Sequence, residues 1–162
     1  MASDLARAAA VQANHDVGQR ETDGPNDSPR IRQYHATTGA APGSPYCASA
    51  ICTWVQEAGF RLGCTPNLRF SASACKLYFL NPGRSILPHS LTLEDIPCIG
   101  VLDHGGGKGH AYLVVGYEPA TGGLVTIEAN SNGAGSREGQ GVYALNIRSV
   151  HDHNLLGFVR VE

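Results

Sequence analysis

The stretch around Cys47 constrains this chain most, because a loop rich in glycine and proline runs directly into an apolar segment at a cysteine. Pro45 stands just before it, and proline is tolerated at a helix start, where the backbone donor is unpaired anyway. Apolar residues then recur at intervals of three and four, as on one buried helix face: Ala48, Ile51, Trp54, Val55 and Ala58. Gly59 is expected to end the segment. We therefore predict a buried helix whose first turn holds Cys47.

This placement gives Cys47 two possible roles. The unpaired N–H groups and the positive dipole end of a helix start favour a thiolate. Cysteines in such positions have pKa values lowered from about 8.5 to roughly 3.5–7.5, although apolar burial opposes the shift. Free cysteine is also among the most buried residue types, so Cys47 as a small core residue is the alternative. The stretch alone leaves both interpretations open.

The order of the expected elements indicates an α+β fold, in which N-terminal helices pack on a C-terminal antiparallel sheet. Four helices are expected over 2–17, over 30–35 with Ser28 as cap and Pro29 at its first position, over 47–59, and after a cap at Ser71. The pattern then changes to strands, over 96–102, 110–117, 124–129, 142–147 and 156–161. A chain of 162 residues suits one domain, which we expect to span 1–162.

Composition excludes several functions. The net charge is −2 and only 16% of residues are charged, so nothing favours binding to nucleic acid or to an anionic membrane. No apolar run approaches about 18 residues, so no membrane span is expected, and the first residues lack the pattern of a signal peptide. The five cysteines include no C-x-x-C pair, which argues against structural zinc, and their odd number leaves at least one free.

A nucleophilic thiol needs a base and a group that orients the base. His110 opens the strongest predicted strand directly after a glycine-rich loop, and the next strand carries Glu128 and Asn130 on one face. A hairpin would bring this pair near the histidine. Taken singly, His110 is more typical of an ordinary strand-edge histidine and Glu128 of a solvated acid. Together with Cys47, the residues form a nucleophile, base and orienter set.

Several short motifs, taken in order, resemble the CHAP-domain cell-wall amidohydrolases, which are papain-like and related to NlpC-type peptidases. The motifs cover about residues 15 to 160 and are 19–21 (Gln-Arg-Glu), 45–48 (Pro-Tyr-Cys-Ala), 109–110 (Gly-His), 127–130 (Ile-Glu-Ala-Asn) and 141–143 (Gly-Val-Tyr). The resemblance implies a papain-like fold with Cys47 as nucleophile, His110 as base, Glu128 as third member and Asn130 as a polar site residue. Tyr46 stands where many relatives have tryptophan.

The mechanism expected from this set is thiolate attack on an amide, with the backbone N–H of Cys47 at the oxyanion. Tyr46 and Ser44 are the candidates for a further oxyanion or substrate contact, and loops 103–109 and 131–140 are expected to flank the cleft. Neither a metal nor another cofactor is expected. Gly105–Gly109 lacks a phosphate-loop pattern, and a metal held by His151 and His153 on one strand face is the weaker alternative.

The resemblance thus implies a peptidoglycan hydrolase, either an N-acetylmuramoyl-L-alanine amidase or an endopeptidase, acting as a phage lysin or an antibacterial toxin. The expected partners are peptidoglycan and, for a toxin, an immunity protein; we expect a monomer. The enzyme would act at the cell wall, reached by lysis or a specialised secretion route. The alternatives are an acyltransferase or protein-directed thiol enzyme of the same fold, and an inactive wall-binding domain.

Overall fold

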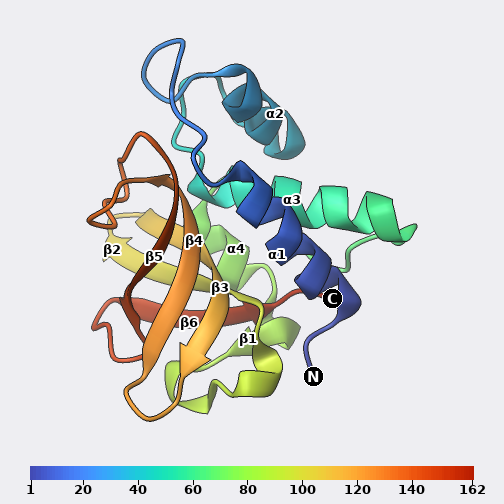
Figure 1. Ribbon diagram of the computed structural model, residues 1–162, viewed down its shortest axis with the longest axis vertical. Coiled ribbons are helices and arrows are strands. Elements are labelled where there is room, and N and C mark those ends of the chain that lie inside the picture. Colours follow the sequence, from blue (N-terminus) through green and yellow to red (C-terminus); the bar gives the residue numbers. More distant parts are fainter.

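The computed structural model describes all 162 residues and confirms the α+β class (Figure 1). Four α-helices come first in the chain, followed by an antiparallel sheet of six strands. The helices are α1 (Asp4–Asp16), α2 (Pro29–Thr38), α3 (Cys47–Leu62) and α4 (Ala74–Phe79). The strands are β1 (Ser85–Ile86), β2 (Cys98–Gly105), β3 (Lys108–Glu118), β4 (Gly123–Ser131), β5 (Gly141–Ser149) and β6 (Leu155–Arg160).

The helix ends explain where the predicted boundaries were wrong. α3 continues past Gly59 and ends at Gly63, whose φ of 66° is the left-handed conformation that suits a helix end. Gly59 is instead a packing residue, since a Cβ there would overlap the carbonyl oxygen of Cys64 and the ring of Pro66. The cap of α4 is Ser73 and not Ser71, because the Ser73 side chain accepts from the backbone N–H of Lys76.

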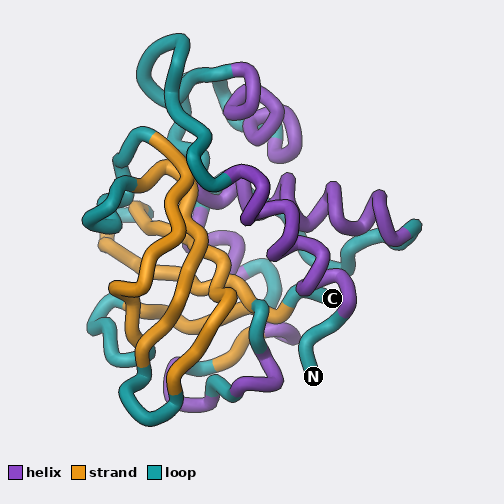
Figure 2. Tube along the Cα trace, in the orientation of Figure 1, coloured by secondary structure: helices purple, strands orange, loops and turns teal.

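The strands lie in the order β1-β6-β2-β3-β4-β5, which Figure 2 shows as a curved sheet beside the helices. β2 and β3 form a tighter hairpin than expected: the strands run to Gly105 and from Lys108, and Gly106 and Gly107 both have positive φ, as a two-residue turn that matches strand twist requires. The expected loop over 103–109 is therefore mostly strand.

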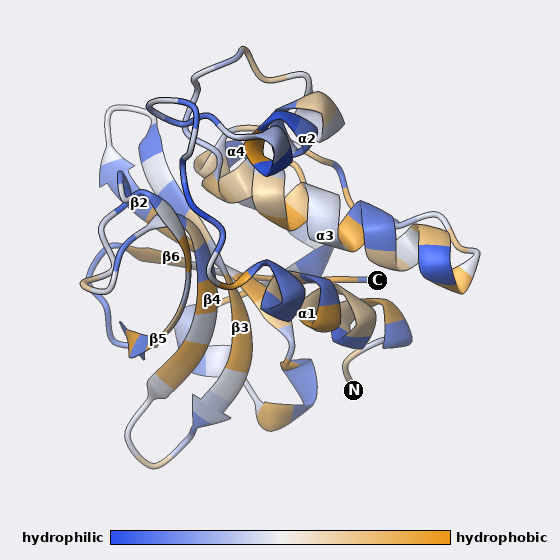
Figure 3. Ribbon diagram, turned by 45° about the horizontal axis from the view of Figure 1, so that its top comes forward, coloured by the Kyte–Doolittle hydropathy of each residue, from blue (hydrophilic) through white to orange (hydrophobic).

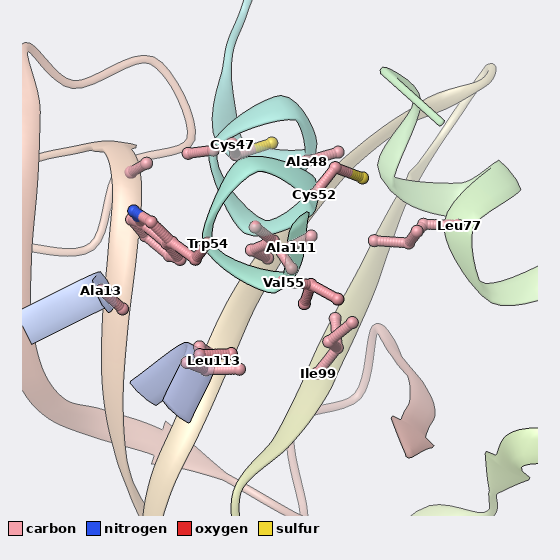
Figure 4. Close-up of a cluster of buried hydrophobic side chains, with 14 of the residues drawn as sticks. Ala13, Cys47, Ala48, Cys52, Trp54, Val55, Leu77, Ile99, Ala111 and Leu113 are labelled. Carbon is pink, nitrogen blue, oxygen red and sulfur yellow. The ribbon is translucent and has the colours of Figure 1, made fainter. Parts of the chain in front are cut away.

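The sheet is covered on both faces. The larger core, a cluster of 27 buried residues, joins α1, α3 and α4 to one face, and Figure 4 shows Ala111 and Leu113 of β3 beside α3. A smaller core on the other face holds the alternate β3 residues Tyr112 and Val114. Figure 3 shows the first turns of α3 as hydrophobic and α2 as largely hydrophilic. The first nine residues of α3 are all buried, so this helix start lies inside the protein.

The positions of two histidines and the lengths of the helices bear on the expected metal site and membrane span. His151 and His153 lie in the turn between β5 and β6, so they do not share a strand face as predicted. None of the helices has both the length and the apolar character needed to cross a bilayer.

Candidate active site

Cys47 is the first residue of α3, as the sequence predicted, and its side chain is buried. The other three α-helices each begin with a serine whose hydroxyl accepts a backbone N–H, namely Ser3, Ser28 and Ser73. α3 has no such cap, since Tyr46 at its N-cap position makes no side-chain capping bond. The N–H groups at this helix start therefore remain for other acceptors, and the dipole favours negative charge there.

The start of α3 lies beside the part of the sheet where β3 and β4 are not paired. β3 and β4 pair from Leu113 opposite Ile127 onward, so β3 residues before Leu113 have no partner on β4. The N–H of Ala111 in this unpaired part interacts with the Cys47 thiol, as does the N–H of Ala48. Burial opposes the thiolate, but His110 together with these two N–H groups outweighs it, so the pKa of Cys47 lies below its ordinary value.

His110 links the thiol to a carboxylate. Its ring is fully buried, and Nε2 lies 2.8 Å from Oε2 of Glu128. The Cys47 thiol interacts with the same ring, and Nδ1 is the nitrogen left for it, with no other hydrogen-bond partner. Burial alone would lower the pKa of His110, but contact with Cys47 and Glu128 raises it to about 9. These shifts favour an imidazolium between a thiolate and a carboxylate.

Glu128 is held by two residues that the sequence interpretation missed. Arg148 of β5 donates from Nε to Oε1 at 2.9 Å and from Nη2 to Oε2 at 2.7 Å, and the Thr126 hydroxyl donates to Oε1 at 2.7 Å. Burial would raise the pKa of Glu128, but His110 and Arg148 lower it to about 2. Thr126 could have been found from the sequence, because it lies two residues from Glu128 and so on the same strand face.

Asn130 does not reach His110 by any hydrogen bond. Its backbone has φ of 55°, in the left-handed region, and the β4–β5 register shifts between Glu128 and Ser131. The side-chain Nδ2 donates to the carbonyl of Arg137 at 2.9 Å, while the buried Oδ1 has no partner. Of the two candidate orienters, the structure therefore brings only Glu128 to the histidine.

Tyr46 and Ser44 flank the cysteine but point elsewhere. The Tyr46 ring is buried and stacks on Tyr34 with centroids 6.0 Å apart, and its hydroxyl donates to Glu21 at 3.3 Å. The Ser44 hydroxyl donates to the carbonyl of Ala41. Neither side chain has a hydrogen bond toward the thiol, so the oxyanion donors that the structure offers are backbone N–H groups.

A polar cleft of about 630 Å³ lies beside this helix start. It is formed by the loop after α1, by Pro45 and by the β4–β5 loop, and its lining contains no hydrophobic residue. The lining residues are Glu21, Gly24, Pro25, Asn26, Pro45, Asn130, Glu138 and Gln140. The 131–140 loop supplies Glu138 and Gln140 to this cleft, and no lining residue comes from the expected loop 103–109.

The remaining chemistry-bearing residues do not assemble into a second site. No three histidine, cysteine or acidic side chains come together as metal ligands would. All five cysteines are free, and burial raises the pKa of Cys52, the other cysteine of α3, to about 12. Cys47 is therefore the thiol whose surroundings favour the nucleophilic form.

Taken together, the geometry provides a thiolate, a proton carrier and a fixed carboxylate, which can carry out acyl transfer. No protein-family model matches the chain, and no curated protein or solved structure matches it either.

Proposed function

We propose that this protein is a cysteine hydrolase that cleaves an amide bond of peptidoglycan. The observation that carries the proposal is the buried series Cys47–His110–Glu128, which begins at an uncapped helix start and ends on a carboxylate held by Arg148. An inactive domain would have no need of this arrangement, because a buried ion pair is costly and is weak support for stability.

The chemistry follows from the placement of each atom. The Cys47 sulfur attacks the amide carbonyl carbon, and the developing oxyanion accepts from the backbone N–H of Cys47. His110 gives its Nδ1 proton to the leaving nitrogen, so the C–N bond breaks and a thioester remains. His110 then takes a proton from water, the hydroxide attacks the thioester, and the carboxylic acid is released as the Cys47 thiolate and the His110 imidazolium are restored. Glu128 keeps the ring oriented and stabilises its charged form.

Two observations favour a polar glycopeptide as substrate. The cleft has no hydrophobic lining residue, whereas pockets for apolar ligands are lined mostly by apolar side chains. The ordered motifs around Cys47, His110 and Glu128 resemble those of the CHAP-domain wall hydrolases. We propose on this basis that the amide lies in the stem peptide of peptidoglycan or at its junction with muramic acid, and that the protein acts at the cell wall as a lysin or toxin.

The test uses purified sacculi, with turbidity and mass spectrometry of the released fragments. Wild-type protein is expected to release fragments, and Cys47→Ala to reduce the rate by at least about a thousandfold, since the nucleophile is removed. Cys52→Ala is the matched control: it removes a buried thiol from the same helix and should retain the activity. New amino termini within the stem peptide identify an endopeptidase, and a freed lactyl carboxylate on muramic acid identifies an amidase.

Two results would contradict the proposal. One is wild-type protein that releases no fragment from sacculi of any peptide chemistry, and the other is a Cys47→Ala variant that cleaves at the wild-type rate.

A further inference from the structure

Arg148 donates three side-chain hydrogen bonds, two of them to Glu128. Its backbone lies opposite Leu124, four residues along β4 from Glu128, and its side chain reaches that carboxylate. It covers both carboxylate oxygens of Glu128 in a fork, the geometry in which arginine binds a carboxylate most strongly.

Arg148 is itself fixed from two sides. Its Nη2 donates to the carbonyl oxygen of Gly135 at 2.7 Å, and its guanidinium carbon lies 5.5 Å from the ring centre of Tyr112. Gly135 has φ of 74°, and a Cβ there would crowd Ile147 and Arg148. The guanidinium is therefore held in the orientation that Glu128 needs.

The four charges at the site alternate in sign along the series. Thiolate, imidazolium, carboxylate and guanidinium sum to zero, and the middle two side chains are fully buried. Without Arg148, the buried set would carry one uncompensated negative charge, which is costly in low dielectric and favours uptake of a proton.

Apart from His110 of the series itself, no cation other than Arg148 bonds to Glu128. Other titratable groups interact electrostatically with the four charged residues at longer range and come from several elements: Cys52 of α3, Cys75 of α4, His104 of β2, Tyr112 of β3 and Asp152 of the β5–β6 turn. None of them makes a hydrogen bond to either oxygen of Glu128, so none can replace the fork of Arg148.

We propose that Arg148 is a positioning residue that keeps Glu128 ionised and oriented, and through Glu128 and His110 keeps Cys47 a thiolate at a lower pH than an ordinary cysteine would be. This inference rests on the thiol mechanism proposed above, but not on the identity of the substrate. Arg148 acts through Glu128: it makes no hydrogen bond to the thiol and is not among the residues that line the cleft.

The test is the pH dependence of Cys47 alkylation by iodoacetamide, measured from about pH 4 to pH 9 and resolved from the other four thiols by peptide mass spectrometry. In Arg148→Gln, the pH below which alkylation fails should rise by about one unit or more, since an adjacent arginine lowers a carboxyl pKa by about 1–3 units. Arg148→Lys keeps the charge without the fork and should show a smaller rise.

Arg160→Gln is the matched control. Arg160 also donates from a strand to a buried carboxylate, that of Asp95 at 2.9 Å, but this pair contacts none of the four residues of the series. Its alkylation profile should coincide with that of wild type, because loss of a strand arginine by itself does not alter the charge at Cys47.

The inference is overturned if Arg148→Gln lowers the alkylation rate at every pH but leaves the profile unmoved, which is the result of a merely structural role. Should Arg148→Gln not fold, a wild-type profile in Arg148→Lys overturns it in the same way. Sacculus cleavage measured alongside separates the two proposals: a shifted profile in a protein that cleaves no sacculi refutes the substrate alone, and cleavage with an unmoved profile refutes the role of Arg148 alone.

Discussion

Two buried carboxylates in this protein, Asp16 and Glu128, have similar hydrogen-bond partners and differ in the ring that donates to them. Asp16, at the end of α1, accepts at Oδ2 from the hydroxyl of Tyr34, from Nε1 of Trp54 and from Nε of Arg30, at 2.7 to 2.9 Å. Glu128 accepts from Thr126, Arg148 and His110 at similar distances. Each carboxylate therefore links three elements: α1, α2 and α3 at Asp16, and β3, β4 and β5 at Glu128.

The two sites differ in whether one of the donors has a second polar atom that faces another reactive group. Tyr34 and Trp54 have their polar atoms bonded to Asp16, and Arg30 has Glu57 as a second partner, so the Asp16 cluster ends there and ties α1, α2 and α3 together. His110 has a second ring nitrogen, which faces a thiol. A buried carboxylate with an arginine is thus no sign of catalysis by itself; the sign is a titratable partner with a free atom next to a nucleophile.

The largest effect that should separate the two clusters is on stability. Asp16→Ala leaves the Tyr34 hydroxyl, the Trp54 N–H and part of Arg30 without a partner inside the protein, which should lower the free energy of unfolding by about 3–5 kcal/mol. The measurement is urea unfolding, with Cys47 alkylation at pH 6 as the readout of the site. The alkylation rate of the folded fraction should stay at the wild-type value.

Asp23→Ala is the control for this change, because it removes an aspartate that pairs with Arg32 at the surface and should cost less than about 1 kcal/mol. An Asp16→Ala protein as stable as Asp23→Ala would show that the buried cluster does not tie the three helices together.

Glu128→Gln should have the opposite profile, with a larger effect on chemistry than on folding. The expected loss is more than about tenfold in kcat with little change in KM, because the carboxylate acts mainly on the charged ring in the transition state. The sign of the pH effect follows from the pKa of His110, which contact with Cys47 and Glu128 raises to about 9 against the opposing effect of burial. Without the carboxylate this pKa falls, so the alkaline limb of the pH–rate profile should move to lower pH.

The profile is measured on a defined muropeptide, with Thr126→Val as the comparison variant. Thr126 donates to the same carboxylate but is uncharged, so it should shift the alkaline limb less. An unmoved limb in Glu128→Gln would mean that this carboxylate does not set the protonation of His110.

Much of this site could be predicted from the sequence because it follows from local patterns. The apolar spacing after Cys47 placed the thiol at a helix start, and the expected hairpin placed Glu128 on the strand next to His110. The class of fold followed from the order of helices and strands. These features depend on residues within one element or one hairpin.

The parts that were missed depend on register and on long side chains. The partner strand of β4 is shifted twice, so no alternation in the sequence shows that Arg148 reaches a carboxylate four residues away along β4. The same irregularity affects Asn130: extending the β3–β4 register backwards from Leu113 would place Asn130 opposite His110, but its left-handed backbone turns it toward Arg137. A sequence pattern assumes a regular strand, and both residues lie where the strand is irregular.

The smallest expected effect is that of Asn130→Ala, which tests whether Asn130 or Glu128 orients His110. Asn130 shares a strand with Glu128, yet its Nδ2 holds the β4–β5 loop through the carbonyl of Arg137, and the residue lines the polar cleft. Its loss should therefore loosen the loop that supplies Glu138 and Gln140 to the cleft, and should raise KM by about threefold while leaving kcat and the pH–rate profile as in wild type, since uniform binding is what is removed. Steady-state kinetics on the same muropeptide tests this, beside Glu128→Gln. If Asn130→Ala lowers kcat more than Glu128→Gln does and moves the alkaline limb, then the amide and not the carboxylate orients His110 during catalysis, and the assignment of the two residues is reversed.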